Sequence, residues 1–280
     1  EGGNGYYNFR LPFMRKQFKD WAIQYHVNLL VSSLDLDEDG QKFNSVFSVN
    51  SNGLLLDEYK KVKLTPIGEE SFTPGKSLHP VKTEFGLAGI LVCFESAFSS
   101  LARNLRNQGA RFILITSSDA PFKNSTLPLL HSSMAIFRAV ENRIPVIRSA
   151  NTGPSMVIDP WGRVLARTSF YKEEILVSEL ALFENQKTLY LRFGFIWLGF
   201  PGLFSIWVVG SFFNKVPEKV GRFCSSFRLK PILFPALSSL FFIFIIPVFS
   251  LFAISVSHNS MGLQKSISFF LNSKKIISYH

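Results

Sequence analysis

Two long stretches without a charged side chain constrain this sequence most. They are Phe193–Phe213, with 21 residues, and Pro231–Val256, with 26 residues. Because a helix rises about 1.5 Å per residue, about 20 apolar residues cross the roughly 30 Å hydrocarbon core of a bilayer. The prolines inside both stretches are tolerated in membrane helices. We therefore predict a transmembrane helix within 189–213 and a second one at 231–256; two buried core helices are the alternative.

The positive charge is concentrated beside these stretches. Nine of the 30 Lys and Arg, but only one of the 20 acidic residues, lie from Leu189 onward. Most of the net positive charge therefore lies outside residues 1–188. These residues lack the strongly positive charge typical of nucleic-acid-binding domains, and we expect no nucleic-acid partner. Short loops rich in Lys and Arg stay in the cytoplasm, so we expect 214–230 to be a cytoplasmic linker. Residues 1–188 and the basic tail 257–280 then face the extracytoplasmic side, and we expect an export signal upstream of Glu1.

Residues 1–188 contain regular patterns of both helices and strands. Helical spacing or capping is found at 11–26, 97–108 and 126–142, with Leu129, Leu130, Ser133, Met134, Phe137 and Val140 expected to face inward in the last. Short apolar runs predict strands at 27–36, 43–49, 54–56, 86–94, 112–116, 144–149, 156–158, 164–166 and 175–180. We expect the first of these strands to be buried, and Asn52-Gly53 predicts a tight hairpin turn between 43–49 and 54–56. Alternation of this kind predicts an α/β (α+β layered) domain. We find no metal-ligand cluster or phosphate-binding loop, and we expect no metal or cofactor.

Cys93 is the first candidate for chemistry. It ends the apolar strand at 86–94 and precedes a helix, and a thiolate is stabilised beside a helix N-terminus. The other cysteine, Cys224, lies in the basic linker, where an unmodified and a palmitoylated thiol are both open. By its position alone, Cys93 is equally well explained as a small core residue.

The segments around Cys93 resemble a known family. Y-K-K-V-K-L-T-P-I-G-E at 59–69, followed by a strand that ends in C-F-E at 93–95, is similar to the carbon–nitrogen hydrolase (nitrilase) superfamily. I-T-S-S-D-A at 115–120, H-x-x-M-A-x-x-R-A-x-E from His131 and R-S-A-N-T-G from Arg148 resemble its membrane-bound branch, the apolipoprotein N-acyltransferases. The resemblance implies a nitrilase-like αββα sandwich over residues 1–188, without its first strand, followed by transmembrane helices.

The resemblance also implies a catalytic triad. Its motifs assign the nucleophile to Cys93, the lysine to Lys61 and the base to Glu1, with supporting roles for Glu69 and Glu95. Lys60 and Lys63 are then solvated neighbours. A frayed terminus is the alternative for Glu1, and ordinary surface charges are the alternative for Glu69 and Glu95. Such a triad uses the carboxylate as a proton acceptor and the ammonium to stabilise the thiolate and an oxyanion.

The function implied by the resemblance is an N-acyltransferase of the bacterial inner membrane. A phospholipid acyl chain would pass to Cys93 as a thioester and then to the N-terminal S-diacylglyceryl-cysteine of an apolipoprotein. Two alternatives stay open: a membrane-tethered nitrilase-type amidohydrolase, and a non-catalytic membrane scaffold. The short stretch from Glu69 to Cys93, together with Ser118, favours the scaffold, because the family has a longer loop and an Asn at these places.

Overall fold

The computed structural model describes residues 8–122, 125–182, 187–194, 199–214 and 266–272. Its helices are α1 (Pro12–Tyr25), α2 (Ser99–Asn107), α3 (Leu127–Asn142), α4 (Leu189–Phe193) and α5 (Gly199–Asn214), with 3₁₀ turns η1 (Cys93–Ala97) and η2 (Ala120–Phe122). Its strands are β1 (Leu29–Leu36), β2 (Lys42–Val49), β3 (Leu55–Lys60), β4 (Val81–Thr83), β5 (Gly86–Val92), β6 (Phe112–Ser117), β7 (Val146–Ala150), β8 (Met156–Ile158), β9 (Val164–Arg167), β10 (Ile175–Ala181) and β11 (Ser266–Asn272).

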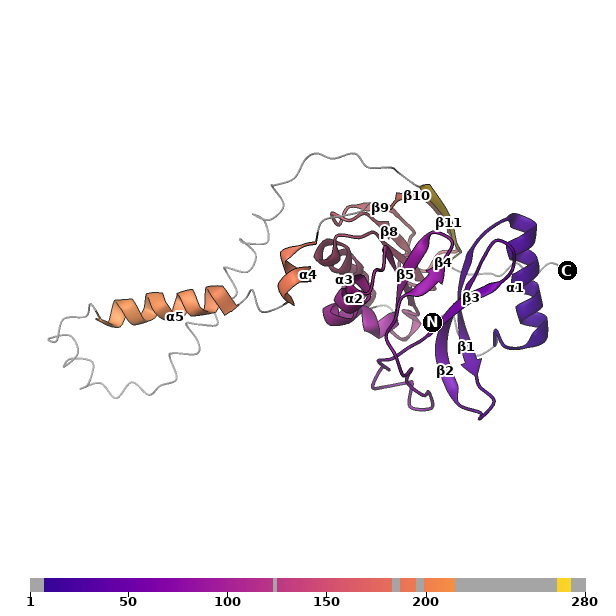
Figure 1. Cartoon of the computed structure of the whole chain (residues 1–280), viewed down its shortest axis with the longest axis horizontal. Coiled ribbons are helices and arrows are strands. Elements are labelled where there is room, and N and C mark those ends of the chain that lie inside the picture. Colours follow the sequence, from indigo (N-terminus) through magenta and orange to yellow (C-terminus); the bar gives the residue numbers. More distant parts are fainter. Residues whose placement is uncertain (1–7, 123–124, 183–186, 195–198, 215–265, 273–280) are drawn as a thin grey trace. The chain divides into compact units, whose positions relative to one another are not determined.

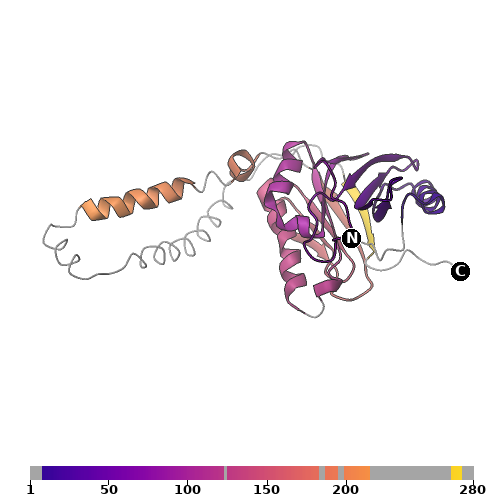
Figure 2. The ribbon, with the colours of Figure 1, turned by 90° about the horizontal axis from the view of Figure 1, so that it is seen from below.

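Two sheets lie face to face between two layers of helices (Figures 1 and 2). One sheet has the order β1-β2-β3 and is antiparallel, and its outer face packs against α1. The other has the order β4-β5-β6-β7-β8-β9, and its outer face is covered by α2 and α3. Val46 and Tyr59 of the first sheet pack against Ile90 and Leu114 of the second in the central core. The predicted layered α/β fold is therefore confirmed.

The first sheet and its helix follow local sequence signals. Pro12 starts α1, where its missing N–H costs no hydrogen bond, and Met14, Phe18 and Ala22 at four-residue spacing are buried on the sheet. The predicted hairpin turns at Gly53, whose φ of +75° is unstrained only without a Cβ. Our expectation that 27–36 is a buried strand was wrong in part. Most of β1 is half-exposed, because it lies at the edge of the sheet.

The second sheet brings three chain segments to one place. β5, β6 and β7 are neighbours and parallel, so their carboxyl ends lie at the same edge of the sheet. Cys93 follows β5, Asp119 follows β6 by two residues, and Arg148 lies inside β7. In open parallel sheets, ligand sites form outside the carboxyl ends of the strands. The fold therefore places Cys93 where the chemistry of such a sheet takes place.

The orientation of α3 differs from our prediction. Leu129, Leu130 and Phe137, expected to face inward, are each more than half exposed. The buried face instead carries Pro128, Ser132, Ala135, Arg138, Ala139 and Asn142. The small side chains on this face let the helix approach the sheet closely. The two larger polar side chains, Arg138 and Asn142, donate hydrogen bonds to backbone carbonyl groups. A prediction from hydrophobicity alone therefore assigned the wrong buried face to α3.

The C-terminal part is described in two segments. α5 covers most of the first predicted transmembrane stretch, and β11 pairs antiparallel with β10. Over the residues with a described structure, no helix combines the length and the apolar character needed to cross a bilayer. Residues 215–230 of the predicted linker 214–230 and the second predicted span, 231–256, lie outside the described residues, so the two-span topology stays a prediction.

Candidate active site

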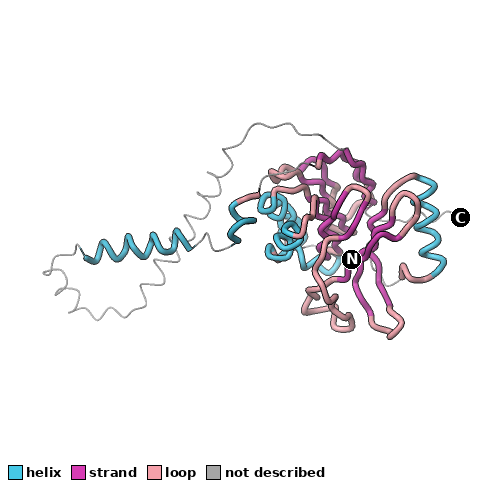
Figure 3. The backbone as a smooth tube through the Cα atoms, in the orientation of Figure 1, coloured by secondary structure: helices cyan, strands magenta, loops and turns pink. Residues whose placement is uncertain are grey.

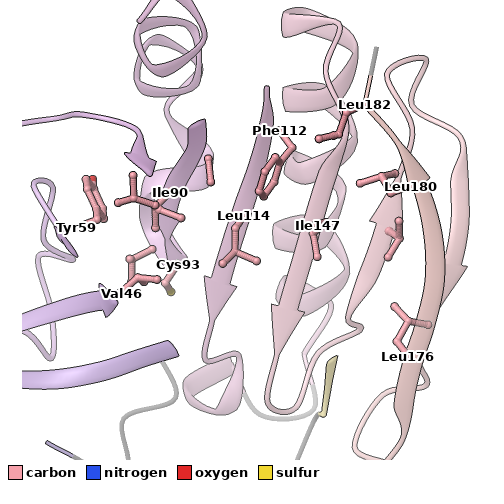
Figure 4. Close-up of a cluster of buried hydrophobic side chains, with 14 residues drawn as sticks. Val46, Tyr59, Ile90, Cys93, Phe112, Leu114, Ile147, Leu176, Leu180 and Leu182 are labelled. Carbon is pink, nitrogen blue, oxygen red and sulfur yellow. The ribbon is translucent and has the colours of Figure 1, made fainter. Parts of the chain in front are cut away.

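Cys93 occupies a strained turn at the end of β5. Its φ is +50°, in the left-handed region, and the residue starts η1. For a residue with a Cβ this conformation costs roughly 1–2 kcal/mol, so the surroundings must hold it. Cys93 forms no disulfide, the residue is 7% exposed, and it lies in the central core near Val46 (Figure 4). The cysteine that the sequence singled out is thus held in an unusual backbone geometry.

Lys61 begins the long loop between β3 and β4, a segment without helix or strand (Figure 3). Its backbone N–H donates to the Asn44 carbonyl at 2.8 Å, and its carbonyl accepts from the Gly75 amide at 2.7 Å. The side chain is fully buried, and Nζ donates to both oxygens of Glu69 at 2.9 and 2.8 Å. A buried ammonium needs an opposite charge, and Glu69 supplies it.

Glu69 is itself held in place by donors besides Lys61. Asn44 donates its side-chain amide to Oε1 at 3.0 Å, and the Thr65 amide donates to Oε2 at 2.6 Å. Only 6% of the residue is exposed. Glu69 is therefore a buried partner of Lys61, which excludes the alternative of an ordinary surface charge.

Glu95 joins the lysine loop to the cysteine turn. Its Oε1 accepts from the amides of Val62 and Lys63 at 2.9 and 3.0 Å, immediately after Lys61. Its Oε2 accepts from the Val92 amide at 2.8 Å, immediately before Cys93. The carboxyl group thus connects the two residues that follow Lys61 with the residue that precedes Cys93, although 29 and 30 positions separate them along the chain.

Burial changes the electrostatics of Glu95. Complete burial raises the pKa of Glu95, and the amides of Val92 and Lys63 and the Tyr59 hydroxyl oppose that rise without cancelling it. The Tyr59 hydroxyl donates to the carboxyl group at 2.9 Å, and burial together with the charge of Glu95 raises the pKa of Tyr59. Glu95 too is excluded as an ordinary surface charge.

Lys63, Lys60 and Glu1 are the remaining positions considered from the sequence. Lys63 is exposed, with Nζ 3.9 Å from the centre of the Phe98 ring. Lys60 is half-buried, with Nζ 3.5 Å from Asp35. Glu1 lies outside the described residues.

A second buried charge cluster lies at the ends of β6 and β7, and sequence reasoning assigned it no role. Arg148 Nη2 donates to both oxygens of Asp119 at 2.9 and 2.7 Å, and His131 Nδ1 lies 2.9 Å from Asp119 Oδ1. Burial by itself raises the pKa of Asp119, but the hydrogen bond from His131 and the charge of Arg148 outweigh it and hold the pKa below its ordinary value. A Cβ at Gly153 would lie 1.7 Å from Asp119 Oδ2, so the close packing of the R-S-A-N-T-G segment requires glycine there.

This second cluster reaches the cysteine through its backbone. His131 Nε2 lies 3.1 Å from the Cys93 carbonyl oxygen and 3.1 Å from Ser96 Oγ. The only sequence signal for the cluster was that its members stand in the three stretches matched by the family resemblance. Across the described ranges, no group of three His, Cys, Asp or Glu could hold a metal ion.

Taken together, an αββα sandwich with a strained cysteine at a strand end and a buried lysine–glutamate pair define a nitrilase-type α/β protein. A sequence profile of the carbon–nitrogen hydrolase family matches residues 13–188. The chain therefore belongs to the carbon–nitrogen hydrolase family. Among solved structures, the carbon–nitrogen hydrolase from Helicobacter pylori is similar with a TM-score of 0.53 and 21% identity, over 57% of this chain and 64% of that one. That similarity bears on the fold alone.

Two similar sequences carry a more specific name. The apolipoprotein N-acyltransferase of Geobacter metallireducens is 32% identical over 66% of this chain and 40% of its own length. The apolipoprotein N-acyltransferase of Photobacterium profundum is 29% identical over 76% of this chain and 46% of its own length. The chain therefore spans less than half the length of these two relatives.

Proposed function

We propose that this chain carries the catalytic domain of a lipoprotein N-acyltransferase, with Cys93 as nucleophile, Lys61 as oxyanion-stabilising cation and Glu1 as base. The observation that carries the proposal is the position of Glu95, whose carboxyl group binds amides next to both Lys61 and Cys93. Its relatives named apolipoprotein N-acyltransferase support the choice of reaction.

The first half-reaction loads the enzyme with an acyl group. Glu1 takes the proton of the Cys93 thiol, and the thiolate forms a C–S bond with the carbonyl carbon of a phospholipid ester. The Lys61 ammonium stabilises the oxyanion of the tetrahedral intermediate. The intermediate collapses as the C–O bond breaks, and the lysophospholipid oxygen takes the proton from Glu1. The products are a thioester at Cys93 and a lysophospholipid.

The second half-reaction transfers the acyl group to an amine. The α-amine of an S-diacylglyceryl-cysteine attacks the thioester carbonyl, and its proton moves to Glu1. The C–N bond forms and the C–S bond breaks with the thiolate of Cys93 as leaving group. Glu1 then returns its proton to the Cys93 sulfur, which restores the thiol and the Glu1 carboxylate. Glu69 positions Lys61 through two hydrogen bonds, and Glu95 positions the two catalytic segments.

The location follows from the predicted spans. The uncharged stretches Phe193–Phe213 and Pro231–Val256 anchor the domain in the inner membrane, and the basic segment between them stays cytoplasmic. The catalytic domain then lies on the periplasmic side, where its lipid donor and its lipoprotein acceptor are both bound to the same membrane.

The test is to look for the acyl intermediate. The full chain in phospholipid vesicles should gain the mass of one acyl group, and neutral hydroxylamine should remove it because thioesters are labile to this reagent. Cys93→Ala should abolish the adduct, and the matched variant Cys224→Ser should keep it. An adduct that persists in Cys93→Ala contradicts the proposal. Hydrolysis of small amides without an acyl adduct would instead indicate a tethered amidohydrolase.

A further inference from the structure

The turn that holds Cys93 is bound by side chains of one helix. Arg138, which is buried, donates from Nη1 to the carbonyl oxygens of Ser96 at 3.3 Å and Ala97 at 3.4 Å. His131 lies seven residues earlier, which is about two helical turns, so both side chains project from the same face of α3. His131 Nε2 lies 3.1 Å from the Cys93 carbonyl oxygen. Three carbonyl groups of η1 therefore face α3.

Both nitrogens of the His131 ring face oxygen atoms. Nδ1 lies 2.9 Å from the Asp119 carboxylate, which can only accept, and Nε2 faces the Cys93 carbonyl, which also only accepts. The Ser96 hydroxyl donates to that same carbonyl at 2.8 Å, so it does not need Nε2 as its acceptor. An N–H at Nε2 therefore matches the Cys93 carbonyl, which can only accept.

The groups around the ring hold it in this orientation. The Asp119 carboxylate lies between the Arg148 guanidinium and the imidazole, with Arg148 Nη2 2.7 Å from Oδ2. Arg148 Nη2 is also 3.4 Å from His131 Nδ1. His131 is only slightly exposed, and its ring packs edge-on against Phe122 with 5.6 Å between ring centres. The ring is thus fixed by its neighbours.

We propose that His131 is a positioning residue for Cys93: its Nε2–H binds the Cys93 carbonyl and holds the left-handed turn that orients the thiol. This inference rests on the proposed function, in which Cys93 is the nucleophile. Asp119 and Arg148 act one step further out by orienting the imidazole. The left-handed backbone conformation of Cys93 costs conformational free energy. A hydrogen-bond donor directed at the Cys93 carbonyl stabilises that conformation.

The experiment compares three substitutions of His131 in the full chain with Cys224→Ser, so that Cys93 is the only cysteine. Gln places an amide N–H near the position of Nε2, whereas Asn places one near Nδ1. His131→Gln therefore keeps a donor for the Cys93 carbonyl, His131→Asn keeps the bond to Asp119 alone, and His131→Ala removes both. The rate of acyl-thioester formation is measured against phospholipid concentration, together with Tm.

We expect the maximal rate to fall by about 10²-fold in His131→Asn and His131→Ala, because misplacement of a reacting group by about 1 Å costs that much. In His131→Gln it should stay within about tenfold of the parent, and the phospholipid concentration for half-maximal rate should not change. A purely structural role would lower Tm and rate together in Gln and Asn alike. Equal rates for those two variants, or parental rates for all three, would overturn the inference.

A variant of Ser96 tests the same carbonyl contact if the histidine variants do not fold. Ser96→Ala removes the other side-chain donor to the Cys93 carbonyl and should lower the maximal rate about two- to tenfold, as expected for one neutral hydrogen bond. A parental rate in Ser96→Ala contradicts the role of that carbonyl. Acyl transfer that survives Cys93→Ala would refute the proposed function itself, which is a different outcome.

Discussion

Two buried charge clusters adjoin the cysteine turn, and they are built in different ways. Lys61 and Glu69 stand eight positions apart in one loop and pair within it, with Asn44 of β2 as a further partner of Glu69. Asp119, His131 and Arg148 come from a loop, a helix and a strand, and they meet only because β6 and β7 are neighbours. In the function we propose, the first cluster supplies a cation for the reaction, whereas the second positions the backbone of Cys93. On this proposal a local pair serves the reaction directly, and a cluster assembled from distant segments serves geometry.

The largest effect is expected from removing the cation of the first cluster. Lys61→Met should lower the rate of thioester formation by about 10²–10³-fold, because one oxyanion-stabilising group is lost. It also leaves Glu69 buried without its cation, which should lower the free energy of unfolding by about 3–5 kcal/mol. Urea denaturation and the acylation assay measure the two effects.

A double variant separates these two effects. Lys61→Met with Glu69→Gln removes both charges, so stability should largely return while the rate stays low. Lys76→Met, an exposed lysine of the same loop, is the control and should change stability by no more than about 0.5 kcal/mol. Recovery of the rate in the double variant would show that Lys61 acts only on structure.

Within the second cluster, the Arg148–Asp119 ion pair should affect mainly stability. Arg148→Met leaves the Asp119 carboxylate buried without its strongest partner, and we expect a loss of about 3–5 kcal/mol in the free energy of unfolding. Adding Asp119→Asn should restore part of that loss. If Arg148→Met lowered the acylation rate as much as Lys61→Met does, at unchanged stability, the contrast between the two clusters would be wrong.

The second cluster should also make the free energy of unfolding depend on pH. The folded-state pKa of Asp119 lies below its ordinary value of about 3.9, so its ionised form stabilises the fold. That contribution is fully present above the unfolded-state pKa and is lost as the pH falls below about 4, through the folded-state pKa. Unfolding free energies between pH 3 and 7 should therefore fall less steeply with acid in Asp119→Asn than in the exposed control Glu38→Gln. Identical slopes would contradict the assignment.

The smallest effect tests which face of α3 carries these contacts. Phe137→Gln on the exposed face should change stability by no more than about 0.5 kcal/mol. Ala135→Gln on the buried face should cost about 1–3 kcal/mol, because the larger side chain overpacks the helix against the sheet. Thermal denaturation of both variants distinguishes the two faces. A larger loss of stability in Phe137→Gln than in Ala135→Gln would indicate that the face predicted from hydrophobicity is the buried one.

Local patterns in the sequence predicted most of the fold. The extents of α1, α2 and α3 and the hairpin at Gly53 agree with their spacing and turn signals, because each depends on residues close together in the chain. The buried face of α3 could not be predicted. Leu129, Leu130 and Phe137 are among the most hydrophobic residues of that helix, but small residues and Arg138 pack against the sheet and η1.

The candidate site divides in the same way. Cys93, Lys61, Glu69 and Glu95 were found from motifs, and burial distinguished the two glutamates from surface charges. His131 and Asp119 were found in matching stretches but received no role, because their contact with each other and with the Cys93 carbonyl crosses from α3 to the ends of β5 and β6.

The sequence by itself determined the layered α/β domain, the cysteine and lysine segments and the two uncharged stretches, since periodicity, turn residues and motif spacing are all local properties. Only the tertiary structure decided which side of α3 is buried, that Glu95 joins two distant segments, and that a histidine lies against the carbonyl of Cys93. The physical reason is that hydrogen bonds and ion pairs between distant segments depend on how strands are ordered in the sheet, and no spacing along the chain encodes that order.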